Sequence, residues 1–394
     1  MPNVSAARWM QVLHASTDYS FNVADAVTFA DKTFLDAVNN IFSRHNNTAM
    51  KRDLSWTFVQ VFSSIADRDF LMHTLGTRSL ALEQRRSFCV TEIEAAYRWL
   101  IVSLHVLTDF PPDRRAVIDA SLNGVTQTVV SKLDNLSWAD TDLRRALSDK
   151  VLNVSVTMWP TGSLLTTEGI SHFYAGWFSN TSSFTQHWVT AARNWRRLNI
   201  PAYLSEHPRM QQFIEYDYFL NAIQIALVTL QPPWHYANGT KAMTYGTLVF
   251  FYALQLVRSF DAIGLQIDPE GRVSDSWLPA GTKAVTDKRA SCLGSGRDYG
   301  DYFPEVPAIE AAHATFEATL TEHERSQVVV SGCSEDQLFF LAACFILCGL
   351  HDEQEMARRV SCNKAVANFQ PFAKAFGCRD NAAMNPPNKC PFFD

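Results

Sequence analysis

The chain has 394 residues, of which 47% are hydrophobic, 19% charged and 12% aromatic. It therefore carries enough apolar side chain for one or two packed domains, and its composition excludes a disordered protein. The formal net charge is −6 at pH 7, with acidic and basic residues mixed and no basic stripe, which argues against a nucleic-acid partner.

The pattern of residues 29–150 predicts helices. Apolar residues recur at helical spacing between Ile93 and Leu104, and the two prolines of Asp109–Asp113 predict the end of that helix. A second helix is expected over residues 114–133. A third should start within Ser137–Asp140, because acidic residues precede basic ones there, in the order that the helix dipole favours.

The second half mixes shorter elements. Residues 213–218 and 223–230 predict short strands, and residues 245–260 predict a buried helix. A turn at 268–271 and two helices over 307–324 and 336–350 follow. The predicted fold class is mainly α with a small β-sheet (α+β), with a helical lobe over 1–165 and a second domain over 166–394.

Cysteines and glycosylation sequons favour a protein outside the cell. Seven of the eight cysteines fall between Cys292 and Cys390, and none shows the C-x-x-C spacing of a structural zinc site, so disulfides are favoured over free thiols. The N-x-S/T glycosylation sequon occurs at Asn3, Asn46, Asn135, Asn153, Asn180 and Asn238.

The sequence shows neither a signal peptide nor a membrane span. Residues 1–17 have no continuous apolar core, and the longest apolar run, 247–257, is too short to cross a bilayer. With the sequons and cysteines, this suggests an extracellular or cell-surface protein whose N-terminal part is missing from the sequence.

Several short motifs occur together and in a fixed order. They are Leu136-Ser-Trp138, Leu230-Gln-Pro-Pro233, Tyr245-Gly246, Ser259-Phe-Asp261 with Gly264, Asp268, Gly271 and Trp277, Gln337–Leu341, and Phe372–Phe376 with Met384-Asn-Pro386. In this combination, over residues 27–394, the chain resembles the neprilysin and endothelin-converting-enzyme family of zinc metalloendopeptidases. The resemblance implies a thermolysin-like C-terminal lobe and an extracellular or cell-surface location.

The family's HExxH zinc motif has no intact counterpart. In that motif two histidines bind zinc from one helical face, and the glutamate between them polarises the bound water. An ungapped count from Tyr245 to Asp261 places these positions at Leu254, Gln255 and Arg258. Leucine cannot bind zinc, glutamine has no carboxylate to take a proton, and arginine is a permanent cation that would repel the metal.

Other functional positions of the family are also altered. The third zinc ligand falls on Asp301 and its supporting acid on Glu305, and we expect Arg258 to occupy the emptied site and pair with one of them. No histidine stands at the oxyanion position; His351 is nearby but is interpreted as a loop residue. The substrate-binding strand becomes Phe213, Ile214, Glu215 and Tyr216.

The resemblance also implies a disulfide between Cys292 and Cys390. Pairing of Cys89, Cys333, Cys344, Cys348, Cys362 and Cys378 stays open, with Cys344 or Cys348 to Cys362 as examples. Two further patterns, His323-Glu324 and Glu310 with His313, have partial metal-ligand spacing; we interpret the first as a chance match and the second as a helical surface pair.

The expected function is that of a non-catalytic homologue, without a cofactor, that binds peptides or an extracellular protein in the former active-site cleft or acts as a decoy. One alternative is an active zinc metalloendopeptidase that cleaves small peptides with zinc as its cofactor. A second alternative is a fragment without function.

Overall fold

The structure is a computed structural model. It describes residues 5–16, 22, 32–66, 68–177, 183–197, 213–274, 276–291, 304–326, 328–330, 332–347 and 362–393. The chain divides into two compact units, one formed by Met1–Ala95 with Ser182–Trp188 and the other by Ala96–Thr181 with Val189–Asp394. This division is one of packing, and the boundary expected near residue 165 stays a prediction.

The first unit is helical. Its helices are α1 (Ala6–Ser16), α2 (Lys32–Arg44), α3 (Asn47–Ala66), α4 (Arg68–Leu75), the first part of α5 (Arg78–Asp109) and the start of α9 (Phe184–Arg197). The rings of Phe62 and Trp188 lie 5.2 Å apart, and the Trp188 indole donates to the Glu92 carboxylate at 3.2 Å. Trp188 therefore joins α9 to α3 and α5 within this unit.

The second unit begins with the predicted helices. They are α6 (Pro112–Asp134), α7 (Thr141–Leu152) and α8 (Thr167–Phe173). As predicted, α5 ends before the two prolines, and Pro112 then begins α6, where the missing N–H of proline is harmless. The Asp140 carboxylate caps α7 by accepting the N–H of Leu143 at 2.8 Å.

A small three-stranded sheet follows in the second unit. Strands β1 (Ser155–Thr157), β3 (Ala222–Ile225) and β2 (Ile214–Asp217) lie in the order β1-β3-β2, with β3 parallel to β1 and antiparallel to β2. Both predicted strands are confirmed, although β3 ends at Ile225 and residues 227–230 form a 3₁₀ turn. Strand β2 therefore lies at one edge of this sheet.

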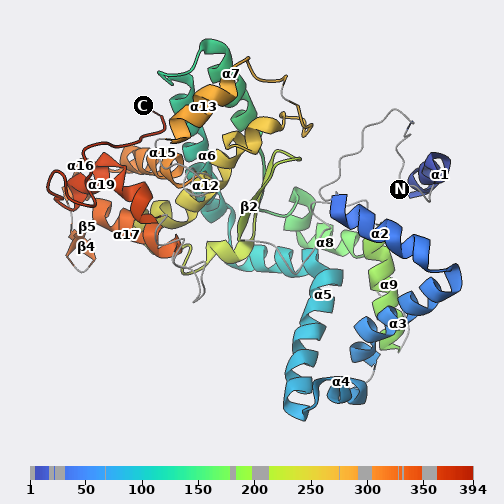
Figure 1. The fold of residues 1–394 in the computed structure, drawn as a ribbon. Coiled ribbons are helices and arrows are strands. Elements are labelled where there is room, and N and C mark those ends of the chain that lie inside the picture. Colours follow the sequence, from blue (N-terminus) through green and yellow to red (C-terminus); the bar gives the residue numbers. More distant parts are fainter. Residues whose placement is uncertain are drawn as a thin grey trace. The chain divides into compact units, whose positions relative to one another are not determined.

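The core of the second unit is built around one apolar segment. It consists of α11 (Lys241–Thr244), a π-helical turn (Tyr245–Val249), α12 (Phe250–Val257) and a 3₁₀ turn (Arg258–Phe260). Figure 1 shows α12 beside α6, α15 and β2, on which it packs. The segment 241–266 is long and apolar enough to cross a membrane, but 67% of its most apolar window is buried, so it is a core helix.

The remaining elements cover this core. They are 3₁₀ turns at Gly162–Leu165 and Gly264–Gln266, helices α13 (Thr282–Ser291), α15 (Glu305–Thr319), α16 (Glu322–Ser326), α17 (Glu335–Leu347) and α19 (Gln370–Ala375), and a hairpin of β4 (Val328–Val330) and β5 (Cys333–Ser334). The mainly helical fold with a small sheet confirms the predicted fold class.

The single helix predicted over 307–324 is two helices. Leu320 is extended, with φ −80° and ψ 130°, and ends α15. The Thr321 hydroxyl accepts the N–H of Glu324 at 3.3 Å, and the Glu324 carboxylate accepts the N–H of Thr321 at 2.8 Å. This reciprocal capping box begins α16 and explains the break.

At two glycines of the predicted motifs a side chain would clash with nearby backbone. A Cβ on Gly246 would lie 2.4 Å from the carbonyl oxygen of Phe339, so glycine lets the π-helical turn pack closely on α17. Gly271 has φ +82°, and a Cβ there would lie 1.8 Å from the carbonyl oxygen of Phe219. Its N–H donates to the Asp268 carbonyl at 3.0 Å, which confirms the predicted turn.

Candidate functional site

The three positions predicted for the HExxH motif lie at the C-terminal end of α12 and in the 3₁₀ turn that follows it. Leu254 is 5% exposed and Gln255 7% exposed, so both face the core. The side-chain oxygen of Gln255 accepts the backbone N–H of Tyr216 in β2 at 3.2 Å. Gln255 therefore acts as a structural acceptor that satisfies a buried strand amide. A carboxamide has no basic site near neutral pH, so it cannot serve as a general base.

Arg258 begins a polar chain at the C-terminal end of α12. One guanidinium nitrogen, Nη1, donates to the Tyr218 hydroxyl at 3.4 Å, and that hydroxyl donates to Asp261 Oδ2 at 2.6 Å. Burial first, and then the Asp261 charge, raise the pKa of Tyr218 to about 12, so its proton stays in place. Among the described residues the Arg258 guanidinium bonds Tyr218 and forms no ion pair with Glu305; the other expected partner, Asp301, lies outside them, so that pairing stays a prediction.

The four residues of the predicted substrate strand alternate between core and surface. Ile214 and Tyr216 are buried at 0% and 3% exposure, whereas Glu215 faces solvent. Phe213 is 45% exposed and its ring lies 4.8 Å from that of Trp234. Because Gln255 already accepts the outer N–H of β2 at Tyr216, that donor is unavailable to an added peptide strand.

Glu310 and His313 are the clearest correction to the sequence analysis. They were expected to form a surface pair, but they are 4% and 1% exposed. The Glu310 carboxylate accepts the backbone N–H groups of Phe392 and Phe393 at 2.8 and 3.1 Å. The prediction failed because it considered only neighbours on one helix, whereas the partners lie at the C-terminus. Glu310 thus anchors the end of the chain to α15.

The His323-Glu324 pair also has a structural role. Besides capping α16, Glu324 forms an ion pair with Lys241 at 2.7 Å. The hydrogen bond from Lys241, together with those from Thr321, lowers the pKa of Glu324 to about 2. His323 is exposed, so this half-motif ties α16 to α11 and brings no metal ligands together.

The structure shows the state of six of the eight cysteines. Cys344 and Cys362 form a disulfide with a Cα–Cα distance of 5.6 Å, one of the two options left open by the sequence. Cys390 is disulfide-bonded; its expected partner Cys292 lies outside the described residues, as does Cys348. The thiols of Cys89, Cys333 and Cys378 are free.

Four of the sequon asparagines lie in described parts of the chain, and all are exposed. Asn46 accepts the N–H of Ala49 at 2.8 Å at the start of α3. Two others end helices and donate to carbonyls of the preceding turn. Exposure is a requirement for glycosylation, which stays a prediction. These four residues are Asn46, Asn135, Asn153 and Asn238; Asn3 and Asn180 lie outside the described residues.

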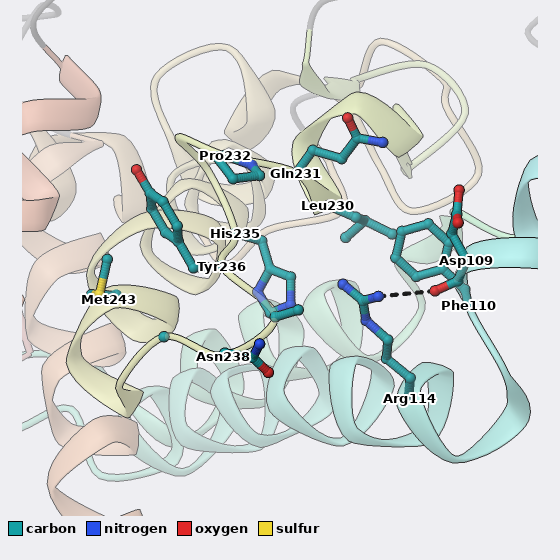
Figure 2. A pocket seen from close by; sticks show the side chains of 12 residues that line it. Asp109, Phe110, Arg114, Leu230, Gln231, Pro232, His235, Tyr236, Asn238 and Met243 are labelled. Atoms are coloured by element: carbon teal, nitrogen blue, oxygen red, sulfur yellow. Dashed lines mark hydrogen bonds between the residues drawn. The ribbon is translucent and has the colours of Figure 1, made fainter.

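A cavity of about 640 Å³ opens beside the loop that carries the Gln-Pro-Pro motif (Figure 2). Arg114 and His235 supply its basic groups, and Asn238 lies at its edge. Arg114 Nη1 donates to the Asp109 carbonyl at 2.9 Å, and its guanidinium lies 4.7 Å from the ring centre of Phe110. One pocket wall therefore comes from the junction of α5 and α6, which no sequence motif marked.

His235 is a neutral, buried group in this cavity. It is 9% exposed, and its Nδ1 has no hydrogen-bond partner among the described residues. Burial first, and then the charge of Arg114, lower its pKa. A neutral imidazole beside a guanidinium can donate or accept one hydrogen bond, so this cavity offers a polar site for an anionic or amide group.

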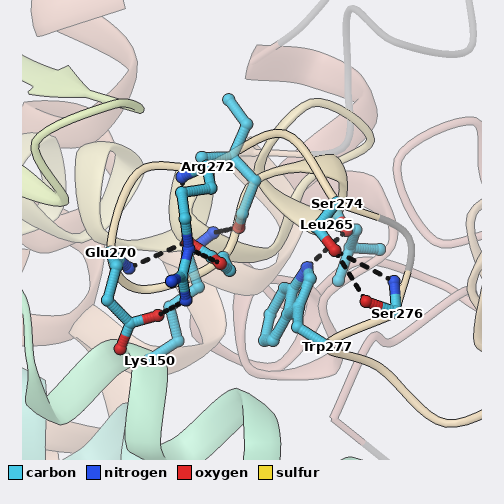
Figure 3. Close-up of polar contacts among 9 residues, drawn as sticks. Lys150, Leu265, Glu270, Arg272, Ser274, Ser276 and Trp277 are labelled. Carbon is cyan, nitrogen blue, oxygen red and sulfur yellow. Dashed lines mark hydrogen bonds and ion pairs between the residues drawn. The ribbon is translucent and has the colours of Figure 1, made fainter. Parts of the chain in front are cut away.

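A buried lysine fixes the loop that follows α12 (Figure 3). Lys150 is 1% exposed, and its ammonium donates to the carbonyls of Gly264 and Ile267 at 2.5 and 2.6 Å. It also lies 5.0 Å from the ring centre of Trp277. Farther along the loop Arg272 bonds Asp268 at 2.7 Å. These contacts give structural roles to several residues of the predicted motif.

Fold and motifs together define a metallopeptidase-type chain, in which the positions predicted for the zinc motif carry Leu254, Gln255 and Arg258. Two family models, both described as peptidase family M13, match residues 1–159 and 299–392, which is well over half of the chain. The chain belongs to peptidase family M13, as its resemblance to neprilysin and endothelin-converting enzyme predicted. Residues 160–298, which include the three altered positions, fall between the two matched ranges.

Curated relatives agree with this assignment. The endothelin-converting enzyme homolog of Locusta migratoria is 21% identical over 401 residues, which cover 91% of this chain and 55% of that protein. Neprilysin of Mus musculus is 19% identical over 415 residues, covering 94% and 54% respectively. The chain thus spans about half the length of the curated relatives it matches.

Solved structures show the same fold. A zinc metalloprotease of Mycobacterium tuberculosis in an open state matches with a TM-score of 0.59 and 18% identity, over 77% of this chain and 51% of that one. A chain of the Haemonchus galactose-containing glycoprotein complex matches with a TM-score of 0.61 and 15% identity, over 82% and 58%. At these identities the matches establish the fold alone.

Proposed function

We propose that this protein is a non-catalytic member of peptidase family M13 that binds a peptide or protein ligand without hydrolysing it. The observation that carries the proposal is the replacement of all three HExxH positions, by Leu254, Gln255 and Arg258, on an otherwise well-packed α12. Peptide hydrolysis by this mechanism needs a metal that lowers the pKa of a bound water and a base that takes its proton. Leucine and arginine provide no zinc ligand, and glutamine provides no base.

The burial of these residues supports the proposal. Leu254 and Gln255 are part of the core, and the amide of Gln255 is engaged with β2. The residues at two of the three positions predicted for the zinc motif thus pack as part of the domain core, and this part of the domain stays folded without a metal site. Exposed sequon asparagines and a disulfide favour a secreted or cell-surface location for the protein.

The cavity beside the Gln-Pro-Pro loop is a candidate ligand site of the protein. Its volume of about 640 Å³ lies in the range typical of pockets that hold small ligands or short peptide segments. Arg114 favours a carboxylate, and His235 adds one neutral hydrogen-bonding group. A peptide with a C-terminal or side-chain carboxylate fits this chemistry, while Leu230 and Met243 offer apolar contact.

The test is a peptidase assay on the purified full chain with a mixture of fluorogenic peptides, with added Zn²⁺ and with a chelator. We expect no chelator-sensitive cleavage under either condition. Chelator-sensitive cleavage that stays with the chain through size-exclusion chromatography would overturn the proposal and support the alternative of an active zinc metalloendopeptidase. Cleavage that separates from the chain would identify a contaminating protease.

Ligand binding is tested separately with a library of fluorescent peptides in solution. We expect the peptides that bind to carry a carboxylate, and Arg114→Ala to weaken their binding about tenfold, as loss of a charge-assisted hydrogen bond predicts. Arg145→Ala, on the outer part of α7, is the matched control. Equal binding by the Arg114→Ala chain would exclude this cavity as the ligand site.

A further inference from the structure

The imidazole of His313 on α15 is enclosed by aromatic rings. It stacks on Phe340 with the ring centres 5.1 Å apart and an interplanar angle of 17°. Phe339 and Phe369 meet it edge-on at 5.1 and 5.3 Å. Its side chain is 2% exposed. These rings fix the orientation of the imidazole but offer its nitrogens no hydrogen bond.

The nitrogen Nε2 points toward a carboxylate without forming a hydrogen bond. It lies 3.4 Å from Oδ1 of Asp336, at the start of α17. Both atoms are buried, and neither has a hydrogen-bond partner among the described residues. Buried polar atoms in folded proteins nearly always have a partner. A cation bound to both atoms would give each of them a partner.

The spacing of the two atoms fits two ligands of one metal ion. Zinc binds histidine nitrogen and carboxylate oxygen at about 2.0–2.2 Å, and a tetrahedral angle then places the two ligand atoms about 3.4 Å apart. A direct N–H···O hydrogen bond would bring them to about 2.7–3.2 Å. The observed 3.4 Å matches the first geometry.

Glu317 is a third candidate ligand, on the same face of α15 as His313. Glu317 is four residues after His313, and residues at this spacing are neighbours on a helix. Ligand atoms of His313, Glu317 and Asp336 all lie within 4.8 Å of one another. Glu317 and Asp336 are 44% and 43% exposed, so a cation can reach the group from solvent.

We propose that His313, Glu317 and Asp336 bind a divalent cation of the zinc class at the junction of α15 and α17. One imidazole and two carboxylates are ligands that such ions accept, and their two negative charges balance a dication. The site lies outside the HExxH positions of α12. It goes beyond the proposed function, because it requires neither peptide binding nor hydrolysis.

Two basic residues near the carboxylates compete with a metal ion for them. Arg325 lies 3.8 Å from Glu317 Oε1, and Lys374 contributes positive charge near Asp336. On the other side of the ring, His313 Nδ1 lies 3.9 Å from Glu317 Oε2. The competing arrangement is thus a protonated imidazole held between the two carboxylates, and the experiment has to separate it from a metal site.

The experiment uses Co²⁺ as a spectroscopic probe, because bound Co²⁺ reports its ligands through visible absorption. The full chain is stripped with a chelator and titrated with Co²⁺, and Zn²⁺ is then added in competition. We expect one Co²⁺ per chain with the absorption of nitrogen and oxygen ligands, displaced by one equivalent of Zn²⁺. No saturable Co²⁺ spectrum would overturn the site and leave the ion-paired imidazole.

Variants assign the site to these residues. His313→Phe keeps an aromatic ring in the cluster, and Asp336→Asn keeps the size of a half-buried side chain. Each should weaken Co²⁺ binding at least tenfold, whereas His323→Ala, at an exposed histidine of α16, should leave it unchanged. Wild-type affinity in Asp336→Asn and His313→Phe would overturn the proposal, even if one of them folds poorly.

Measuring both Co²⁺ binding and peptide cleavage on these samples distinguishes this proposal from the proposed function. Bound metal that depends on His313, without peptide cleavage, supports both. Peptide cleavage that survives in the His313→Phe chain would overturn the proposed function and leave the cation site intact. Lack of Co²⁺ binding in a chain that also fails to cleave peptides would overturn only the cation site.

Discussion

The side-chain oxygen of Gln255 accepts the backbone N–H of Tyr216 at 3.2 Å, so the residue predicted to replace the family's catalytic glutamate holds a strand in place. Both groups are buried. The bond links α12 to the edge of the sheet, where the family's substrate strand is expected. It joins two sequence motifs that are 39 residues apart.

Removing this acceptor should destabilise the domain. Gln255→Ala leaves the N–H of Tyr216 buried without a partner, which costs about 1–3 kcal/mol in the free energy of unfolding. Urea unfolding followed by circular dichroism measures the change. Gln266→Ala, at an exposed glutamine just beyond α12, should change the free energy by less than about 0.5 kcal/mol. Equal stability of both variants would show that the Gln255 bond contributes nothing.

Lys150 should give the protein a pH-dependent stability. Burial lowers the pKa of Lys150 from 10.5 to about 8, against the opposing charges of Asp261 and Asp268. The unfolded chain therefore binds this proton more tightly, and between pH 8 and 10.5 the contribution of Lys150 to the free energy of unfolding rises with pH. Below pH 8 the full penalty of the buried charge, on the order of 2–3 kcal/mol, is present.

Comparing Lys150→Met with the wild type isolates this effect. The variant should lack the rise between pH 8 and 10, whereas loss of the donor to the carbonyls of Gly264 and Ile267 changes its stability by the same amount at every pH. Urea unfolding at several pH values provides the measurement, with the exposed Lys283→Met as control. A difference between wild type and Lys150→Met that is the same at every pH would contradict the buried-charge explanation.

Glu310 should hold the C-terminus of the chain. Its carboxylate accepts two backbone N–H groups, those of Phe392 and Phe393, and charge-assisted bonds of this kind are stronger than neutral ones. Glu310→Ala should therefore cost about 2–4 kcal/mol, whereas Glu310→Gln, which keeps one acceptor, should cost less. Hydrogen exchange of residues 390–393 should speed up in the order wild type, Gln, Ala. Unchanged exchange in the alanine variant would argue against the anchor.

Local elements of this fold follow from the sequence because their causes are local. The two prolines between α5 and α6, the cap at Asp140 and the turn at Asp268 are set by residues within a few positions of each other. The altered zinc positions could be placed because the motifs around them, at Tyr245 and Asp261, allow an ungapped count. The structure confirms the helix break, the cap and the turn, whereas the placement of the zinc motif stays a prediction.

Features made by distant residues were missed. Helical spacing paired Glu310 with His313, but Glu310 bonds Phe392 and His313 faces Asp336, residues that the topology brings to α15 from other parts of the chain. Arg114 and His235 share a cavity although 121 residues separate them, and no periodic pattern connects them. Such pairs depend on the packing of complete helices, which a single sequence does not specify.

The disulfide between Cys344 and Cys362 should contribute to stability under oxidising conditions. It closes a loop with a sequence separation of 18 residues, which by loop entropy predicts about 3 kcal/mol. The double variant Cys344→Ser/Cys362→Ser should unfold at lower urea concentration than the wild type. Adding a reductant should shift the wild type toward the variant; a larger shift than the variant shows would implicate the disulfide of Cys390 as well.

Restoring the motif tests whether the zinc positions alone separate this chain from an active peptidase. In Leu254→His/Gln255→Glu/Arg258→His, two histidines at i and i+4 again face one side of α12, and we expect zinc affinity at least tenfold above that of Leu254→His alone. Both chains should carry His313→Phe, so that the proposed second site does not contribute. Cleavage should remain at least a hundredfold below that of an active zinc metalloendopeptidase, because the residue at the third-ligand position, Asp301, reaches less far than a glutamate. Full activity of the triple variant would show that the rest of the site has kept its catalytic form, and that only these three replacements keep the wild type inactive.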